Sequence, residues 1–297
     1  MRVQLIVTGD MEQRALGESL ERLLRAAGAK VEFLPPRKLG DGAVTTNPLP
    51  PLTSAQTPRT VQRMAKALVT ETLDVSKKNT SLPDLVVGID DLELANAHQP
   101  EVVVGWIRRG VVEEVQSRAK SLSLSSSTVE KIAQELRNRC SFHLLVPLAE
   151  AYLFGEPAAL QRAGVAAATP VYRTEADLED FETNDPRFLP RAAVENARKA
   201  KHGATWWREE KHPKRYLEFL VELSGGLYDE TIGGVHALRT LDWLMTESSS
   251  ALLFARALFE DIGDTLGMPN PLGAGVCCKW TYPSKASRRE ELILRNL

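Results

Sequence analysis

Short apolar runs alternate with segments of helical periodicity through the first half of the chain. Residues 3–7 and 85–89 contain almost no polar side chains, which is typical of parallel strands that are buried on both faces. A helical pattern of leucines follows the first run, and residues 31–34 return to a strand pattern. This order predicts a βαβ unit with a right-handed crossover.

The pattern changes at two places. Residues 35–58 are rich in Pro, Gly and Thr and show no periodicity, which predicts a long surface loop. Because this composition offers few groups that offset the entropy lost on ordering, we expect the loop to be mobile. A further strand is predicted at residues 140–146, after which strand signals fade and helical patterns continue at 213–223 and 234–266.

These patterns predict an α/β fold in two parts. Residues 1–155 are expected to form a mainly parallel sheet flanked by helices, with 3–7 and 85–89 as neighbouring strands. Residues 156–297 are expected to form a mostly helical C-terminal subdomain.

Composition and missing motifs exclude several classes of protein. The chain has 297 residues, is 43% hydrophobic and carries a net charge of -2, so it can bury a large core and has no global basic field. Its three cysteines form no disulfide framework and no CxxC pattern. We expect a cytoplasmic protein with no membrane partner, because no signal peptide or membrane span is apparent. The Walker motif is missing, which argues against ATPase activity by the chain alone. The HExxH, GxSxG and strand-linked GxGxxG motifs are missing as well.

Carboxylates follow three of the predicted strands. They are Asp10 and Glu12, then Asp90, Asp91 and Glu93, and finally Glu150. Ligands of open α/β sheets bind beyond the carboxyl ends of the strands, and carboxylates there can converge on Mg²⁺, which prefers oxygen ligands. Each acid alone could instead cap a helix or stabilise its first turn. Their occurrence at three strand ends favours a functional site.

Several stretches, in this order, resemble the Toprim domain, the metal-binding fold of topoisomerases, primases and overcoming-lysogenisation-defect nucleases. They are TGDMEQRAL at 8–16, VVGIDDLELAN at 86–96, FHLLVPLAEAYLFGE at 142–156, HPKRYLEFL at 212–220 and YDETIGGVHALRTLDW at 228–243. The chain more closely resembles a family of uncharacterised bacterial Toprim-like proteins that are often encoded beside ATPases in phage-defence loci. This resemblance implies a Toprim-like fold and a nuclease dependent on Mg²⁺ or Mn²⁺ that works with an ATPase partner in anti-phage defence.

The resemblance also implies roles for individual side chains. Asp90 and Glu150 would hold the metal with help from Asp91, Glu93 or Asp10. Glu12 would be a further ligand or the general base for the attacking water. In such a nuclease, basic side chains could contact the backbone of a DNA or RNA substrate, although each one alone could instead belong to a solvated charged face. They are Arg108, Arg109, Lys211, Lys214 and Arg215.

Two positions depart from the Toprim pattern. Thr8 stands where Toprim proteins have a glutamate directly after the first strand, and Leu92 replaces the second aspartate of the second motif. These departures leave open a catalytically silent recognition or assembly subunit that binds an ATPase or a nucleic-acid complex. A small-molecule phosphohydrolase built on the same acids is a third alternative, although no stretch resembles a base or sugar pocket.

Overall fold

The structure is a computed structural model that describes residues 1–40, 42–73, 82–174, 177–248, 251–283 and 292–297. Its centre is a parallel sheet with the strand order β2–β1–β4–β5, and β3 also pairs with β1. The strands are β1 (Arg2–Val7), β2 (Glu32–Phe33), β3 (Arg37–Lys38), β4 (Leu85–Asp91) and β5 (Cys140–Leu145). Val3 lies opposite Leu85, so the predicted pairing of the first and third strand runs is confirmed.

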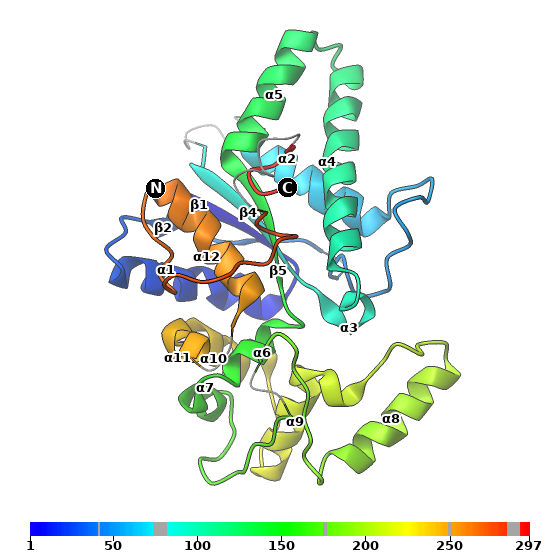
Figure 1. The fold of residues 1–297 in the computed structure, drawn as a ribbon, viewed down its shortest axis with the longest axis vertical. Coiled ribbons are helices and arrows are strands. Elements are labelled where there is room, and N and C mark those ends of the chain that lie inside the picture. Colours follow the sequence, from blue (N-terminus) through cyan, green and yellow to red (C-terminus); the bar gives the residue numbers. More distant parts are fainter. Residues whose placement is uncertain (41, 74–81, 175–176, 249–250, 284–291) are drawn as a thin grey trace.

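Helices cover both faces of the sheet (Figure 1). One face carries α2 (Arg59–Leu73), α4 (Pro100–Ser121) and α5 (Ser126–Arg139), and the other carries α1 (Gly17–Ala26) and α12 (Leu253–Leu266). The predicted α/β class, with a parallel sheet flanked by helices, is therefore confirmed.

The central strands are apolar throughout because neighbouring residues enter two different cores. Leu5 and Val87 pack in the cluster on the α1 side, whereas Ile6 and Val86 pack in the cluster on the α2 side. A strand that is buried on both faces has no polar side to expose, which explains the absence of alternation in its sequence.

The second half of the chain is helical in its described part. It contains α6 (Ala149–Leu153), α7 (Pro157–Arg162), α8 (Leu189–Lys201), η2 (Glu209–Lys211), α9 (Pro213–Leu223), η3 (Glu230–Gly234), α10 (Val235–Arg239) and α11 (Trp243–Ser248). These elements follow the carboxyl end of β5, and α12 then returns to the sheet (Figure 1). The cluster that contains Val87 also contains Leu220 and Phe259, so the two halves share one core.

The C-terminal residues bind the edge of β5. The backbone N–H of Arg295 donates to the carbonyl of Cys140 at 2.8 Å. The Asn296 side chain donates to the Phe142 carbonyl at 2.7 Å and accepts from its N–H at 3.1 Å. This pairing satisfies backbone groups that an edge strand would otherwise leave open. Within the described residues, no helix is long and apolar enough to span a membrane.

The predicted loop at 35–58 contains one short strand, β3, which pairs with β1. The rest of its described part is irregular, as expected, but hydrogen bonds attach it to the body of the protein. Trp106 Nε1 donates to the Pro50 carbonyl at 2.7 Å. The Arg109 guanidinium donates to the carbonyls of Ser54 and Ala55, both at 2.7 Å, and lies over the Trp106 ring. The expectation that few groups offset the cost of ordering this loop is wrong, because its own backbone carbonyls serve as acceptors.

Candidate functional site

The carboxyl ends of the central strands border a cavity of about 340 Å³. Five acids line it: Glu12, Asp91, Glu93, Glu150 and Glu230. His212, Lys214 and Arg215, at the start of α9, also line it. The sequence therefore correctly locates a concentration of charge at this edge, and the structure adds Glu230 from a distant segment.

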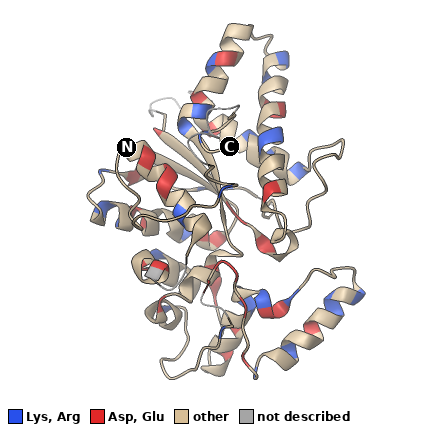
Figure 2. Ribbon diagram, viewed as in Figure 1, with Lys and Arg blue, Asp and Glu red and all other residues tan. Residues whose placement is uncertain are grey.

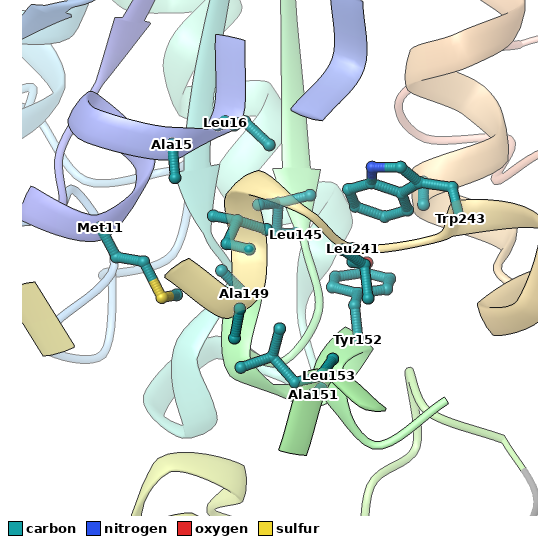
Figure 3. Packing of buried hydrophobic residues seen from close by; sticks show 14 of the residues in the cluster. Met11, Ala15, Leu16, Leu145, Ala149, Ala151, Tyr152, Leu153, Leu241 and Trp243 are labelled. Atoms are coloured by element: carbon teal, nitrogen blue, oxygen red, sulfur yellow. The ribbon is translucent and has the colours of Figure 1, made fainter. Parts of the chain in front are cut away.

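One buried cluster holds the backbone segments that carry Glu12 and Glu150. Glu12 begins the short π-helical segment η1 (Glu12–Leu16), and Glu150 lies in α6. Figure 3 shows side chains from both segments gathered in this cluster, including Met11, Leu16 and Ala149. Both segments pack against α10, which helps to fix the relative positions of the two acids.

Glu12 carries the least satisfied carboxylate of the cavity. Its side chain folds back over Gly9, where an added Cβ would lie 1.8 Å from Glu12 Oε2. That oxygen is buried and has no hydrogen-bond partner among the described residues. Burial, followed by the charge of Glu150, raises the pKa of Glu12 to about 8. A buried carboxylate oxygen without a donor is costly, which makes this atom a candidate ligand for a cation.

Asp91 and Glu150 are also buried carboxyl groups whose ionised forms are destabilised. Burial, and then the charges of Glu12, Glu150 and Glu93, raise the pKa of Asp91 well above its ordinary range. Asp91 Oδ1 accepts a hydrogen bond from the Ala149 N–H at 3.0 Å. Burial raises the pKa of Glu150 to about 7, although the ammonium of Lys214 opposes this shift. The carboxylates repel one another and are incompletely neutralised.

Glu93 lines the cavity and has an unusual backbone conformation. Its φ is +50°, in the left-handed region that costs a non-glycine residue about 1–2 kcal/mol. Its backbone N–H donates to the Pro147 carbonyl at 2.9 Å, which continues the link between the ends of β4 and β5. Burial raises the pKa of the Glu93 carboxyl. No local sequence pattern indicates this conformation.

Lys214 is the main positive charge inside the cavity. It forms an ion pair with Glu230, and its Nζ lies 3.8 Å from Glu150 Oε1. Burial lowers the pKa of Lys214, but the combined attraction of Glu150 and Glu230 raises it above its ordinary value. Burial and the neighbouring Arg215 lower the pKa of His212 to about 3, so His212 is neutral at physiological pH.

Asp90, the expected principal ligand, lies behind the wall of the cavity. Its Oδ1 accepts from Thr8 Oγ1 at 2.5 Å, and its Oδ2 accepts from the Val44 N–H at 2.9 Å and from Thr45 Oγ1 at 3.4 Å. Only 1% of Asp90 is exposed, and it is not among the residues that line the cavity. Thr8 thus serves as a donor to Asp90.

Asn96 holds residues 45–49 of the loop at 35–58, next to the part that Asp90 holds. Its side-chain amide donates to the carbonyls of Thr45 and Asn47, and its Oδ1 accepts from the Leu49 N–H at 2.8 Å. Together with Asp90, it fixes residues 42–49, three of which line the cavity. Asn96 was not assigned from the sequence, because its partners are backbone groups that leave no side-chain pattern.

The remaining predicted residues lie away from the cavity. Asp10 pairs with Lys38 at 2.7 Å, and this hydrogen bond lowers the pKa of Asp10. Arg108 is exposed on α4, while Arg109 fastens the loop at 35–58. Lys211 pairs with acids of another segment, Asp180 and Glu182. Of the basic residues expected to bind nucleic acid, Lys214 and Arg215 line the cavity.

The donor set suits a hard cation, although it is not preassembled. Its carboxylate oxygens are the ligands that Mg²⁺ and Mn²⁺ prefer, and Glu12 offers a buried oxygen without a partner. Across the described ranges, no three His, Cys, Asp or Glu side chains are already arranged to hold a metal ion. A cation would therefore bind by drawing the carboxylates together.

Comparison of the chain with protein-family models, with curated proteins and with solved structures found no match. Functional inference therefore rests on the site itself and on the motifs of the sequence. The fold and site together define an α/β protein with an acidic cavity at the carboxyl edge of a parallel sheet.

We expect Asp90→Ala to lower the free energy of unfolding by about 2–4 kcal/mol, because the buried Val44 N–H and the Thr8 hydroxyl lose their acceptor. Asp90→Asn should change it by less than about 1 kcal/mol, since an amide oxygen can still accept from Val44 while the amide nitrogen donates to Thr8. Urea denaturation in EDTA measures both variants. An alanine variant as stable as the wild type would show that Asp90 does not hold the loop.

Proposed function

We propose that this protein is a Toprim-like nuclease that hydrolyses phosphodiester bonds with Mg²⁺ or Mn²⁺, and that Glu12, Asp91 and Glu150 hold the ion. The observation that carries this proposal is the buried, unpartnered Oε2 of Glu12 in a cavity with four other acids. Carboxylates that raise one another's pKa are stabilised by a bound cation, which removes their repulsion. The departure from the sequence-based expectation is that Asp91, rather than Asp90, faces the cavity.

The chain's own groups have distinct tasks in this proposal. A bound cation would neutralise charge on a phosphoryl oxygen and orient a water. The pKa of Glu12 is about 8 in the metal-free protein, so binding of the cation would release the Glu12 proton and make the carboxylate a ligand. Lys214 and Arg215 supply positive charge at the cavity wall for the substrate phosphate. Asp90 acts as a positioning residue, through the loop that it holds.

A second candidate is a catalytically silent subunit that recognises or assembles an ATPase or nucleic-acid complex. Lys214 favours it, because an ammonium beside Glu150 and Glu230 already neutralises part of the acidic charge without a metal. The unassembled state of the carboxylates favours it too. In this alternative, the acids and Lys214 form a structural network.

The proposed cellular role is that of a cytoplasmic effector of anti-phage defence with an ATPase partner. Its support is the resemblance of the sequence motifs to the Toprim-like family. Co-purification with the product of a neighbouring ATPase gene, if there is one, would test the partnership.

A nuclease assay with the full chain separates the two candidates. Plasmid, single-stranded DNA and total RNA are incubated with Mn²⁺, with Mg²⁺ or with EDTA, while calorimetry follows metal binding to the protein alone. The nuclease proposal predicts saturable metal binding and cleavage that EDTA abolishes. The silent-subunit candidate predicts neither, so an absence of both would end the nuclease proposal.

A further inference from the structure

A second cavity, of about 400 Å³, adjoins the carboxylate site through a shared side chain. It is lined by Arg191, Val194 and Glu195 of α8, by Glu209 of η2 and by Arg215. Glu195 forms an ion pair with Arg198. Arg215 also lines the carboxylate cavity. This arginine, whose side chain is 47% exposed, therefore lies between the two cavities.

The segment that builds the second cavity is locally basic. Residues 189–215 contain eight Lys and Arg residues against three Glu and no Asp, whereas the whole chain has a net charge of -2. Within α8, only Ala192 is buried, so the helix is largely open to solvent. Figure 2 shows basic positions on α8 and on the segment that leads to α9. Clustered basic charge in a neutral chain is an electrostatic footprint of nucleic-acid binding.

Contacts around Trp207 make this segment rigid. The Trp207 ring packs against His212, Lys199 Nζ lies 4.0 Å from its centroid, and its Nε1 donates to Glu209 at 2.8 Å. The Glu209 N–H in turn donates to Asn196 of α8 at 2.7 Å. These hydrogen bonds hold both the side chain and the backbone of Glu209 in place. Rigid segments lose little entropy on binding.

Among the described residues, Arg191 and Arg215 form ion pairs that remain open to solvent. Arg191 pairs with Glu222, with side chains 56% and 61% exposed, and Arg215 pairs with Glu218 within α9, with side chains 47% and 29% exposed. Such exposed pairs contribute little stability, so a phosphate can replace the glutamate at low cost.

Trp206 adds an aromatic surface to the same segment. It is only partly buried, and its ring centroid lies 5.7 Å from that of Trp207. The buried Trp207 thus supports a neighbouring ring that remains accessible. Aromatic rings beside basic side chains bind unpaired strands because the bases stack on the rings. In a duplex the bases are stacked on one another, so their faces are not accessible to a protein ring.

We infer that the second cavity is part of a subsite for an unpaired nucleic-acid strand, where Arg191 and Arg215 bind backbone phosphates. Trp206 does not line the cavity, but it lies on the same segment as Glu209 and would stack on a base beside the cavity. This inference rests on the proposed nuclease function, since it places the strand beside the bond to be cleaved. Arg215 would hold the phosphate nearest to the carboxylates, and Arg191 one further along the strand. The substrate class is therefore single-stranded DNA or RNA, or an unpaired end.

The test measures strand binding without cleavage. Fluorescence anisotropy in EDTA follows a labelled single-stranded oligonucleotide and its duplex, over a series of salt concentrations. We expect the double variant Arg191→Gln/Arg215→Gln to bind the single strand at least about tenfold more weakly. Its salt slope should fall by about 1.4, because each lost phosphate contact on a single strand contributes about 0.7. Trp206→Ala should weaken single-strand binding by about tenfold.

The matched control is Arg137→Gln on α5, which also removes an arginine from an exposed ion pair. It should leave affinity and salt slope unchanged. Melting curves in EDTA check that each variant is folded. Equal binding by the double variant and the wild type would overturn the subsite, as would duplex binding as tight as single-strand binding. Competition by polyglutamate as effective as by the strand would overturn it too, and would point to an acidic protein.

The outcomes also separate this inference from the proposed function. A double variant that keeps Mg²⁺-dependent stabilisation and binds the strand like the wild type would overturn the subsite alone. A wild type that binds the strand as expected, but neither binds Mg²⁺ nor cleaves, would overturn the nuclease proposal and leave the subsite standing.

Discussion

Asp91→Asn is expected to abolish both the stabilisation of the folded protein by Mg²⁺ and all metal-dependent cleavage, whereas Asp90→Asn should keep the stabilisation. Asp91 lines the cavity and interacts electrostatically with Glu12, Glu150 and Glu93. Asp90 lies behind the wall, with hydrogen bonds to both of its carboxylate oxygens. The same isosteric change therefore has different effects at the two adjacent positions. At Asp91 it removes a proposed metal ligand, and at Asp90 it alters a residue that holds the neighbouring loop by hydrogen bonds.

Thermal melting with and without Mg²⁺ measures this difference. A ligand that binds only the folded state stabilises it by about 2.7 kcal/mol when its concentration is 100 times the Kd. The wild type and Asp90→Asn should show this gain, and Asp91→Asn should not. In EDTA, Asp91→Asn should be at least as stable as the wild type, because it removes one of several repelling charges. Its amide oxygen can still accept from the Ala149 N–H.

The result that would contradict this ligand assignment is a reversed pattern. If Asp90→Asn lost the response to Mg²⁺ while Asp91→Asn kept it, Asp90 would be the ligand, as expected from the Toprim motif. If Mg²⁺ did not stabilise the wild type, the result would contradict the nuclease proposal and favour the silent subunit.

The sequence predicts the strands that build the site better than it predicts which side chains enter it. Apolar runs at 3–7 and 85–89 identify buried strands, and parallel pairing then brings their acidic ends together. Asp90 and Asp91 look equivalent in the sequence. Successive side chains of a strand point to opposite faces, and the surrounding fold decides which face borders the cavity.

Long-range contacts account for the other differences. The loop at 35–58 is fixed by backbone groups such as the Val44 N–H, and a backbone N–H leaves no residue pattern. Glu230 reaches the site from a segment more than 75 residues after Glu150. Lys211 and Lys214 occur in one charged run, yet only Lys214 lines the cavity, because Lys211 pairs with Asp180 and Glu182 instead.

The metal-free protein is expected to lose stability as the pH rises from about 6.5 to about 8. The folded-state pKa of Glu12 is about 8 and that of Glu150 about 7, against an ordinary value of 4.5 for both. Between these values the folded state holds more protons than the unfolded state, so stability falls as the pH rises. The loss begins near pH 4.5 and is complete above the folded-state pKa values. Each unit of pKa difference corresponds to at most about 1.4 kcal/mol.

The chosen window avoids an opposing contribution from His212. Its pKa is lowered from 6.5 to about 3, so its contribution to stability rises with pH between these values and is constant above 6.5. From pH 6.5 to 8 the buried acids therefore determine the slope. Asp90 and Glu179, whose pKa values burial raises to about 7, contribute to it together with Glu12 and Glu150. Urea denaturation in EDTA at several pH values measures it directly.

Mg²⁺ should reverse this loss, and its effect should grow with pH, because the cation binds ionised carboxylates. Glu12→Gln should reduce, but not abolish, the fall in stability of the metal-free protein between pH 6.5 and 8, since the other buried acids remain. It should also reduce the response to Mg²⁺. Glu130→Gln on α5, where the side chain is 69% exposed, removes a carboxylate far from the cavity and should change neither. If the stability of the metal-free wild type were constant or increased from pH 6.5 to 8, the pKa values of these acids would not be raised by burial and mutual repulsion. The electrostatic basis of the proposed metal site would then be lost.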